Sequence, residues 1–214
     1  MATSRLHLLP PPGAPATGRY GAAVARALAD RRDALARALD LLCADPAPLC
    51  DAVALLVAAL DGGGKVLAAG NGGSAAEAQH FVAELVGRFK LERRALPALA
   101  LTADPAILTA VANDYGYAEV FARQVRAWGR PGDVLVLFST SGHSPNVLEA
   151  AVAARECGVR VVAVTGAAPN PLASAGDVVL RAPSRDTPLI QEIHAMFVHV
   201  LCDLVEREVA GDHA

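Results

Sequence analysis

Two side chains that can transfer protons, His80 and Glu84, stand four positions apart in the segment NGGSAAEAQHFVAEL, residues 71–85. On a helix this spacing places both side chains on one face, about one turn apart. An imidazole and a carboxylate in that arrangement can act as acid and base, and the same spacing lets two side chains hold one metal ion. An ordinary surface pair of His and Glu has this spacing too, so the two residues alone leave both interpretations open.

A second group of polar side chains lies near the C-terminal end of the chain. Gln191, His194 and His199 interrupt the mostly apolar, helix-like segment IQEIHAMFVHVLCDLVE. Gln191 and His199 differ by ~80° around a helix axis and so share one broad face. Together with His80 and Glu84 they offer imidazole, carboxylate and amide donors that suit Zn²⁺ or a similar cation. A hydrogen-bonded core histidine is the alternative for this segment, and spacing alone does not show whether the two helices meet.

Two loops rich in glycine and hydroxyl residues are candidates for binding a phosphate. They are GNGGS (70–74) and STSGHSPN (139–146), whose hydroxyl donors are Ser139, Thr140, Ser141 and Ser144. Ser144 suits a helix N-cap and Pro145 the first helical position, and a helix N-terminus attracts anions. Neither the GxxxxGK[ST] of a nucleotide P-loop nor GxGxxG is present, so we expect a monophosphate ester and not ATP or a dinucleotide. The alternative for each loop is a polar turn that caps a helix.

Five short apolar runs, alternating with helical segments, predict the elements that would position these residues. The runs span 66–70, 95–102, 133–140, 159–166 and 177–183, and helices are expected over 74–89, 105–111, 117–128, 144–156 and 188–209. Runs that are apolar on both faces are typical of buried parallel strands. Their alternation with helices predicts an α/β fold with helices on both sides of a parallel sheet. Such sheets bind ligands at the C-terminal edge of their strands, where both loops would lie.

Ahead of the first strand the sequence predicts a leader and two helices. Residues 1–18 contain three consecutive prolines and only a very short apolar run, so we expect a flexible Pro-rich leader and not a secretory signal. Helices are expected over 19–45 and 48–60, where they can pack on the later domain or on another subunit. Residues 19–214 are expected to form one domain with this helical extension.

Composition excludes several classes of protein. The 214 residues are 53% hydrophobic and 19% charged, which provides a core and excludes general disorder. A net charge of −3 and 4% aromatic residues give no reason to expect a nucleic-acid ligand. Because no uncharged apolar run reaches the ~20 residues that cross a bilayer, we expect no membrane. The four cysteines lie among apolar residues without CxxC spacing, as buried, reduced thiols of a cytoplasmic protein would.

Four ordered motifs together resemble those of the phosphoheptose isomerases, a family of the sugar isomerase (SIS) domain superfamily. They are NGGSAAEAQHFVAEL, ANDYGYAEVFARQV, STSGHSPNVLEAA and DTPLIQEIHAMFVHVLCDLVE, and the resemblance covers nearly all of the chain after the leader. It implies a flavodoxin-like αβα sandwich with a five-stranded parallel sheet and N-terminal helices. It also implies a homotetramer with sites near subunit interfaces, and conversion of sedoheptulose 7-phosphate to D-glycero-D-manno-heptose 7-phosphate through an enediol.

The resemblance further implies roles for single residues. Glu84 would take the proton from carbon and His199 would donate one to oxygen, although the division of these roles stays open. One Zn²⁺ per subunit would be held by His80, Glu84, Gln191 and His199. The phosphate loop would consist of Ser139, Thr140, Ser141 and Ser144, and the remaining substrate contacts would be Asn71, Gly72, Gly73, Glu84, Asn113, Asp114 and Gln191. His143 departs from the Asn or Lys expected between Gly142 and Ser144, so the mouth of this loop is expected to differ.

Two other functions remain compatible with these motifs. An SIS-type adaptor that binds the bacterial replication initiator has motifs similar to NGGS, QHF and IQE, and an SIS sensor would bind a sugar phosphate without turnover. The SPN after STSGH and the DTP before LIQE are more similar to the isomerases. Turnover of sedoheptulose 7-phosphate that is lost on Glu84→Gln would distinguish an enzyme from both alternatives.

Overall fold

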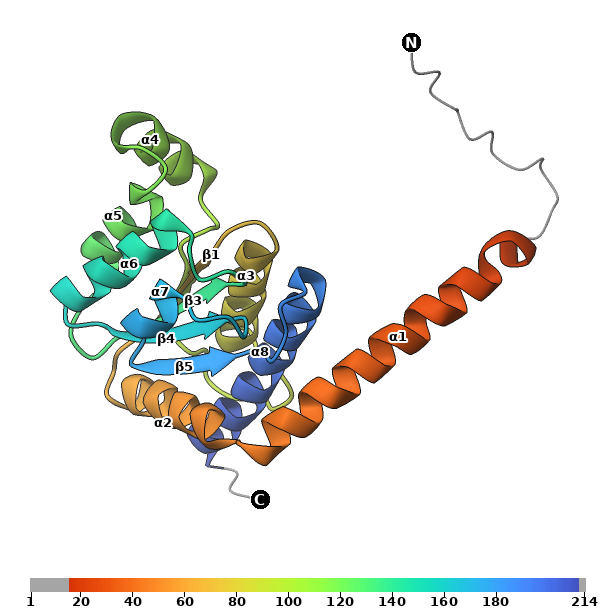
Figure 1. The fold of residues 1–214 in the computed structure, drawn as a ribbon. Helices are drawn as coiled ribbons and strands as arrows, with labels where there is room; N and C mark the ends of the chain where they lie inside the picture. The colour runs from red at the N-terminus through yellow and green to blue at the C-terminus, as the bar shows by residue number, and fades with distance from the viewer. Residues whose placement is uncertain (1–15, 212–214) are drawn as a thin grey trace, which may run out of the picture.

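The computed structural model describes residues 16–211 and contains a five-stranded parallel sheet with helices on both faces (Figure 1). The strands are β1 (Val66–Gly70), β2 (Ala98–Ala100), β3 (Val134–Ser139), β4 (Arg160–Thr165) and β5 (Val178–Arg181), in the order β2-β1-β3-β4-β5. The α/β class, the sandwich and the five predicted strands are confirmed. The strand order reverses between β1 and β3, and open parallel sheets bind ligands beyond the carboxyl ends of the strands at this point.

Eight helices are assigned within the described residues, and they divide into two layers. They are α1 (Ala16–Ala44), α2 (Ala47–Asp61), α3 (Gly73–Val86), α4 (Pro105–Tyr115), α5 (Glu119–Trp128), α6 (Pro145–Glu156), α7 (Pro171–Ala175) and α8 (Thr187–Ala210). The first three and α8 bury one face of the sheet, whereas α4 to α7 bury the other. Alternate residues of one strand serve the two cores: Val66 faces the first and Leu67 the second. This two-sided burial explains why the strands are apolar throughout.

Some boundaries differ from the prediction. The first helix begins at Ala16, inside the segment 1–18 predicted as a leader, and residues 1–15 of that prediction lie outside the described residues. The helix predicted to end at Val111 continues to Tyr115, where Gly116 ends it with φ of 90°. The sequence did not predict α7, because five residues are too few to show a helical period.

The long helix α1 leaves the body of the molecule (Figure 1). Its 29 residues extend about 43 Å, and residues from Ala34 onward pack on the core. Tyr20, Val24 and Leu28, spaced by four residues, form an exposed apolar stripe on the protruding part. An apolar stripe of this kind is typical of a surface that another chain covers.

Burial of the cysteines differs from the expectation. All four are free, but only Cys202 is buried, whereas Cys157 is partly buried and Cys43 and Cys50 are exposed. The expectation of buried thiols is therefore wrong for Cys43 and Cys50. These two residues lie on the helices ahead of the first strand, where less of the helix surface is covered.

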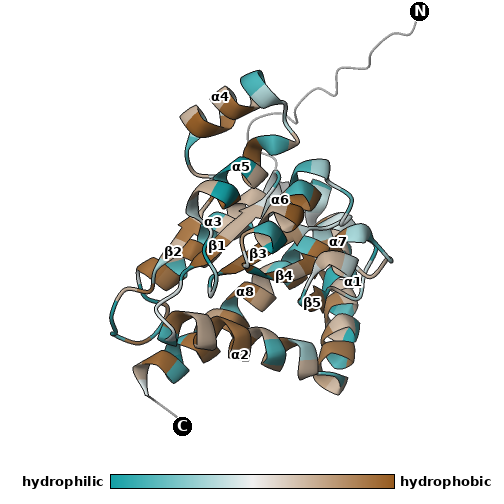
Figure 2. Cartoon of the chain, turned by 90° about the vertical axis from the view of Figure 1, so that its left-hand side faces the viewer, coloured by the Kyte–Doolittle hydropathy of each residue, from teal (hydrophilic) through white to brown (hydrophobic). Residues whose placement is uncertain are grey.

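The length and apolar character of α8 match those of a membrane span, with a mean hydropathy of 1.3. However, α8 lies beneath the sheet near α2 (Figure 2) and packs against both α2 and α3. Half of its most apolar window is buried. A core helix of a soluble protein has these properties, and we interpret α8 as one.

Candidate active site

The His–Glu pair of α3 meets α8, as the catalytic hypothesis requires. His80 Nε2 lies 3.1 Å from Glu84 Oε1. The rings of His80 and His199 meet edge to face, with 5.1 Å between their centroids. His199 also stacks on Phe89, at 5.6 Å. The His80 and Glu84 side chains are 40% and 25% exposed, so a substrate can reach them. We call His80, Glu84 and His199 the proton-transfer cluster, after the role that the motifs predict for them.

Gln191 makes a second contact between α8 and α3. Its amide lies directly against Gly73, the first residue of α3, so that a Cβ at position 73 would overlap the amide nitrogen. The preceding residue, Gly72, has φ of 56°, a backbone conformation that favours glycine. One glycine thus allows the turn after β1, and the other leaves space for the amide.

The loop after β1 is tied to the start of α6 by a pair of amides. Asn71 Nδ2 donates to Asn146 Oδ1, and Asn146 Nδ2 donates to Asn71 Oδ1, both at 2.8 Å. The hydroxyl of Tyr117 donates to Asn71 Oδ1 at 2.9 Å. Asn146 and Tyr117 were not predicted as site residues, although both stand inside the recognised motifs STSGHSPN and ANDYGY. Their contacts fix the two glycine- and hydroxyl-rich loops side by side at the point where the strand order reverses.

The hydroxyls of the loop after β3 are gathered at the N-terminus of α6. Ser139 Oγ accepts a hydrogen bond from Gly142 N at 3.0 Å and lies 3.5 Å from Ser144 Oγ. Ser144 occupies the N-cap position, but within the described residues its side chain makes no capping hydrogen bond. Its hydroxyl therefore contacts Ser139 and is not used in a cap, so it can turn toward a ligand. Gly142 has φ of 66° and packs on Asn170, which leaves no room for a side chain.

A pocket of about 280 Å³ opens beside this loop and brings in residues that sequence reasoning missed. Thr140, Ser141 and His143 line one side, and the segment before α8 lines the other. The missed lining residues are Ser184, Arg185 and Thr187. Their signal was the sequence Ser-Arg-Asp-Thr at residues 184–187, which overlaps the recognised DTP. Hydroxyl donors with one guanidinium suit the charge and size of a phosphate group.

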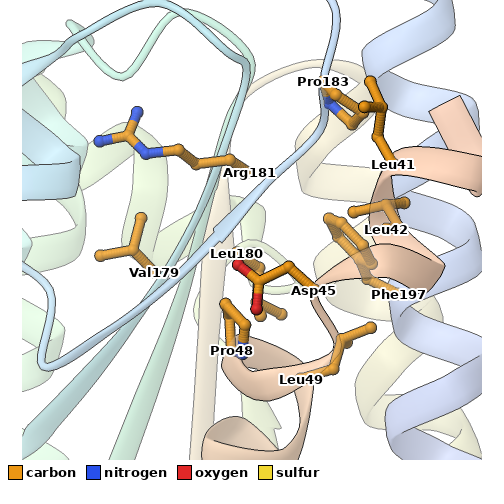
Figure 3. A pocket seen from close by; sticks show the side chains of 10 residues that line it. All are labelled: Leu41, Leu42, Asp45, Pro48, Leu49, Val179, Leu180, Arg181, Pro183 and Phe197. Atoms are coloured by element: carbon orange, nitrogen blue, oxygen red, sulfur yellow. The ribbon is translucent and has the colours of Figure 1, made fainter.

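Another pocket, of about 330 Å³, lies between the α1–α2 turn, β5 and α8 (Figure 3). Its lining is mostly apolar, including Leu42, Leu49 and Phe197. Figure 3 shows Asp45 among these side chains, with Arg181 pointing away from it. Neither the His80–Glu84 pair nor the hydroxyl-rich loops line this pocket, so we do not assign the chemistry to it.

Asn113 and Asp114 are not brought to the proton-transfer cluster within one chain. They are exposed on α4, where Asn113 Nδ2 donates to Asp114 Oδ1 at 2.8 Å. The helix α4 packs on the face of the sheet opposite α8 (Figure 1). Their role as substrate contacts remains a prediction.

A buried carboxylate holds the C-terminal end of α3 against α8. Glu206 accepts hydrogen bonds from the backbone N–H groups of Phe89, Lys90 and Leu91, at 2.8, 2.6 and 2.9 Å. Burial acts to raise the pKa of Glu206, but these three donors and the nearby Arg93 guanidinium hold that pKa below its ordinary value. Arg93 in turn donates to the carbonyl oxygens of Glu84, Leu85 and Gly87, which caps the end of α3. We call this arrangement the Arg93–Glu206 clamp.

The buried thiol of Cys202 is excluded as a nucleophile. Burial, and after it the nearby Glu84 carboxylate, raises the pKa of this thiol well above its ordinary value. Only the thiolate is strongly nucleophilic, so Cys202 acts as a packing residue next to Glu84.

Comparison with known proteins shows which family this chain belongs to. The SIS domain family matches residues 24–166. A phosphoheptose isomerase of Citrifermentans bemidjiense is 57% identical over 158 residues, which are 74% of this chain and 82% of that protein. The chain belongs to the phosphoheptose isomerase family. A family member from Streptomyces coelicolor is 60% identical over 159 residues, which are 74% of this chain and 69% of that protein.

The solved structures agree with this membership. The phosphoheptose isomerase GmhA from Neisseria gonorrhoeae superposes with a TM-score of 0.79 at 44% identity, covering 87% of this chain and 98% of that one. The SIS fold and the isomerase class inferred from the motifs are therefore confirmed. The motifs left an adaptor and a sensor open as alternatives, but the relatives described here are all named as phosphoheptose isomerases.

The side chains of the proton-transfer cluster are of the kinds that bind a divalent metal, but they are not arranged around a common metal position. His80, Glu84 and His199 are neighbours and offer two imidazoles and a carboxylate. Within residues 16–211, however, no three His, Cys, Asp or Glu side chains are already grouped as ligands. His80 and Glu84 bond to each other and His199 stacks on Phe89, so binding would require these side chains to turn.

Proposed function

We propose that this isomerase converts sedoheptulose 7-phosphate to D-glycero-D-manno-heptose 7-phosphate through an enediol. The convergence of His80, Glu84 and His199 from α3 and α8 is the observation that carries this proposal. Relatives named phosphoheptose isomerase, at more than half sequence identity, support the substrate class.

The order of contacts along α8 supports a direction for the substrate. Thr187 and Ile190 line the hydroxyl-rich pocket, Gln191 contacts Gly73, and His199 meets His80. The rise from Gln191 to His199 is about 12 Å. A sugar phosphate lying along this path would place its phosphate in the pocket and its carbonyl end near the proton-transfer cluster.

The proposed reaction moves a proton from C1 to C2 of the open-chain sugar. Glu84 takes the proton from carbon, and His199 donates a proton to the carbonyl oxygen, so that the enediol forms without a free charge on oxygen. With its proton on Nε2, His80 donates to Glu84 Oε1 and leaves the second carboxylate oxygen for the substrate. Glu84 then gives its proton to C2 while the C1 hydroxyl gives its proton back to His199, which forms the aldose carbonyl and restores both residues. The roles of Glu84 and His199 can be exchanged in the reverse direction.

The phosphate contributes by orientation. Ser139, Thr140, Ser141 and Ser144 would hold it at the N-terminus of α6, and Arg185 would add a positive charge. Fixing the far end of a flexible sugar lowers the entropy lost in reaching the reactive geometry. Asn71, Gly72, Gly73, Asn113 and Asp114 remain the proposed contacts to the rest of the sugar.

We further propose one Zn²⁺ per subunit, held by His80, Glu84, Gln191 and His199 after their side chains turn. When bound, the metal would polarise the substrate carbonyl. Glu84 cannot act as tight ligand and free base together, so its two roles require adjustment during turnover. Metal content measured by mass spectrometry on protein purified without added metal tests this proposal, and zinc below one-tenth of an equivalent contradicts it.

A homotetramer in the cytoplasm is proposed as the working form, with sites near subunit interfaces. The exposed apolar stripe of Tyr20, Val24 and Leu28 supports an assembly. The exposed position of Asn113 and Asp114 on α4 suits a contact made to a site in a neighbouring subunit.

The deciding experiment incubates the purified protein with sedoheptulose 7-phosphate, with and without a chelator, and identifies the product sugar. We expect an aldose phosphate from the unmodified chain and none from Glu84→Gln. Binding without aldose formation would contradict the proposed reaction and favour a sensor.

A further inference from the structure

A histidine–glutamate pair, His194 and Glu77, joins α8 to the first half of α3. His194 is completely buried, and its Nδ1 lies 3.4 Å from Glu77 Oε2. Its Nε2 lies 3.2 Å from the carbonyl oxygen of Thr165, at the end of β4. Among the described residues, neither His194 Nδ1 nor Glu77 Oε2 makes a hydrogen bond, although both atoms are buried. The rings of Phe138 and Phe197 lie beside the imidazole.

Counting protons shows that this arrangement needs one more proton than neutral His and ionised Glu supply. The Thr165 carbonyl can only accept, so His194 Nε2 carries a proton. In a neutral imidazole Nδ1 is then an acceptor, and it would face a carboxylate oxygen that is also an acceptor. Two buried acceptors facing each other are unfavourable, because neither is compensated by a hydrogen bond. A proton between the two atoms removes this conflict, and we place it on Nδ1, the ring nitrogen that faces the carboxylate.

We propose that Glu77 and His194 are positioning residues, joined by a proton on Nδ1, that set the contact between α3 and α8 on which the reaction depends. Glu77 lies one helical turn after Gly73 and one turn before His80, and His194 lies one turn after Gln191. The pair is thus placed between the Gly73–Gln191 contact and the His80–His199 contact. Loss of the Glu77–His194 pair would change the spacing at both of these contacts, without removing a group that touches the substrate.

The pair works together with the Arg93–Glu206 clamp. The clamp holds the C-terminal end of α3, and the Glu77–His194 pair holds its first half. The proton-transfer residues His80 and Glu84 lie between these two polar attachments. The kinetic part of this inference rests on the proposed function, whereas the proton on Nδ1 does not.

The test compares three variants of the full chain with the unmodified protein. Glu77→Gln replaces the carboxylate by an amide that can donate to a neutral Nδ1, so the helices stay joined without the additional proton. Glu77→Ala leaves Nδ1 without a partner. Glu92→Ala is the matched control, because it removes a carboxylate whose side chain is 92% exposed.

The first readout is nitrogen-15 NMR of histidine-labelled protein, with the His194 signals assigned by their loss in His194→Gln. We expect a proton on Nδ1 in the unmodified protein and in Glu92→Ala, and no proton on Nδ1 in Glu77→Gln. A His194 Nδ1 without a proton in the unmodified protein at pH 7 overturns the inference, and so does a protonated Nδ1 in Glu77→Gln. This readout needs no substrate, and Glu77→Gln decides it even where Glu77→Ala does not fold.

The second readout is kinetic. We expect kcat to fall at least about tenfold in Glu77→Ala with KM nearly unchanged, because misalignment affects the reacting groups more than the phosphate grip. Glu77→Gln should recover kcat to within about threefold of the unmodified protein. A folded Glu77→Ala with full kcat overturns the positioning role. Absence of turnover in the unmodified protein would instead count against the proposed function, and the NMR result would still decide the protonation.

Discussion

At the scale of single residues, the candidate site depends on a glycine, Gly73, as well as on reactive side chains. Gly73 has no Cβ, and the amide of Gln191 occupies the space that a Cβ would need. The atom in conflict is the far end of a flexible side chain, so a substitution here would move Gln191 and leave the backbone in place. We therefore expect Gly73 to affect the proposed reaction more than the fold.

Gly73→Ala is accordingly expected to lower kcat/KM by about tenfold or more, because displacement of Gln191 misplaces substrate or metal. The free energy of unfolding should change by less than about 1 kcal/mol. Turnover assays and urea unfolding measure both effects. Gly18→Ala, at a helical position with nothing within 4 Å of the added carbon, is the control and should leave kcat/KM unchanged. A stability loss in Gly73→Ala as large as the activity loss would contradict this explanation.

Arg185 provides the second prediction at this scale. Arg185→Ala is expected to raise KM for the sugar phosphate about five- to tenfold with little change in kcat, because it removes one charge-assisted contact to the phosphate. The difference in KM between variant and unmodified protein should shrink as salt is added. Arg94→Ala, which removes another exposed guanidinium, is the control. An unchanged KM would exclude Arg185 from the phosphate site.

At the scale of elements, the segment between α3 and β2 is organised by one carboxylate. Glu206 binds three successive backbone N–H groups, and the first of these belongs to Phe89, the residue on which His199 stacks. The position and orientation of His199 are therefore linked to the ionisation of Glu206, which lies two turns farther along α8. The Arg93–Glu206 clamp thus supports the fold and the site together.

This clamp predicts how stability depends on pH. The folded pKa of Glu206 lies below its ordinary value of 4.5, so its contribution to stability is complete above that pH and is lost as the pH falls through the folded pKa. Glu206→Gln is expected to reduce the free energy of unfolding by about 2–4 kcal/mol at pH 7. The difference from the unmodified protein should shrink as the pH is lowered below 4.5.

Urea unfolding at pH 7 and at several values below 4.5 measures this difference. Glu92→Gln, which changes a carboxylate whose side chain is 92% exposed, is the comparison variant. A difference that stays constant over the whole pH range would show that Glu206 acts through its shape and not its charge.

At the scale of the whole molecule, the layers of the sandwich could be predicted from the alternation of apolar strands and helical segments in the sequence. Residues 66–70 were predicted as a strand with the boundaries that β1 has, because a run buried on both faces must be apolar throughout. Asn146 was missed as a site residue, because its partner Asn71 lies far away in sequence and only the strand order brings them together. Likewise, Arg185 was missed because its local pattern of hydroxyl residues does not show that a loop from another part of the chain completes the pocket. Sequence periodicity predicts elements, whereas contacts between loops depend on the topology.

The exposed stripe of α1 gives a prediction for the assembly. Leu28→Glu, at a side chain that is 67% exposed, is expected to lower the oligomeric state, because a carboxylate would be buried against an apolar partner surface. Light scattering coupled to size-exclusion chromatography measures the mass. Ala22→Glu introduces the same charge on the opposite side of the helix and serves as the control. An unchanged mass in Leu28→Glu would show that this stripe is not an interface.

The arrangement of contacts along α8 has a consequence for how this protein can vary. From Thr187 to Glu206 this helix lines the hydroxyl-rich pocket, contacts Gly73, reaches Thr165 and Glu77, meets His80 and joins the clamp. Deleting one residue within it would rotate every later side chain by about 100° and shift it by about 1.5 Å. Point substitutions each weaken one of these contacts, but a change of length would misalign all those beyond it at once. The spacing between Gln191 and Glu206 is therefore expected to tolerate no insertion or deletion, even where the individual side chains vary.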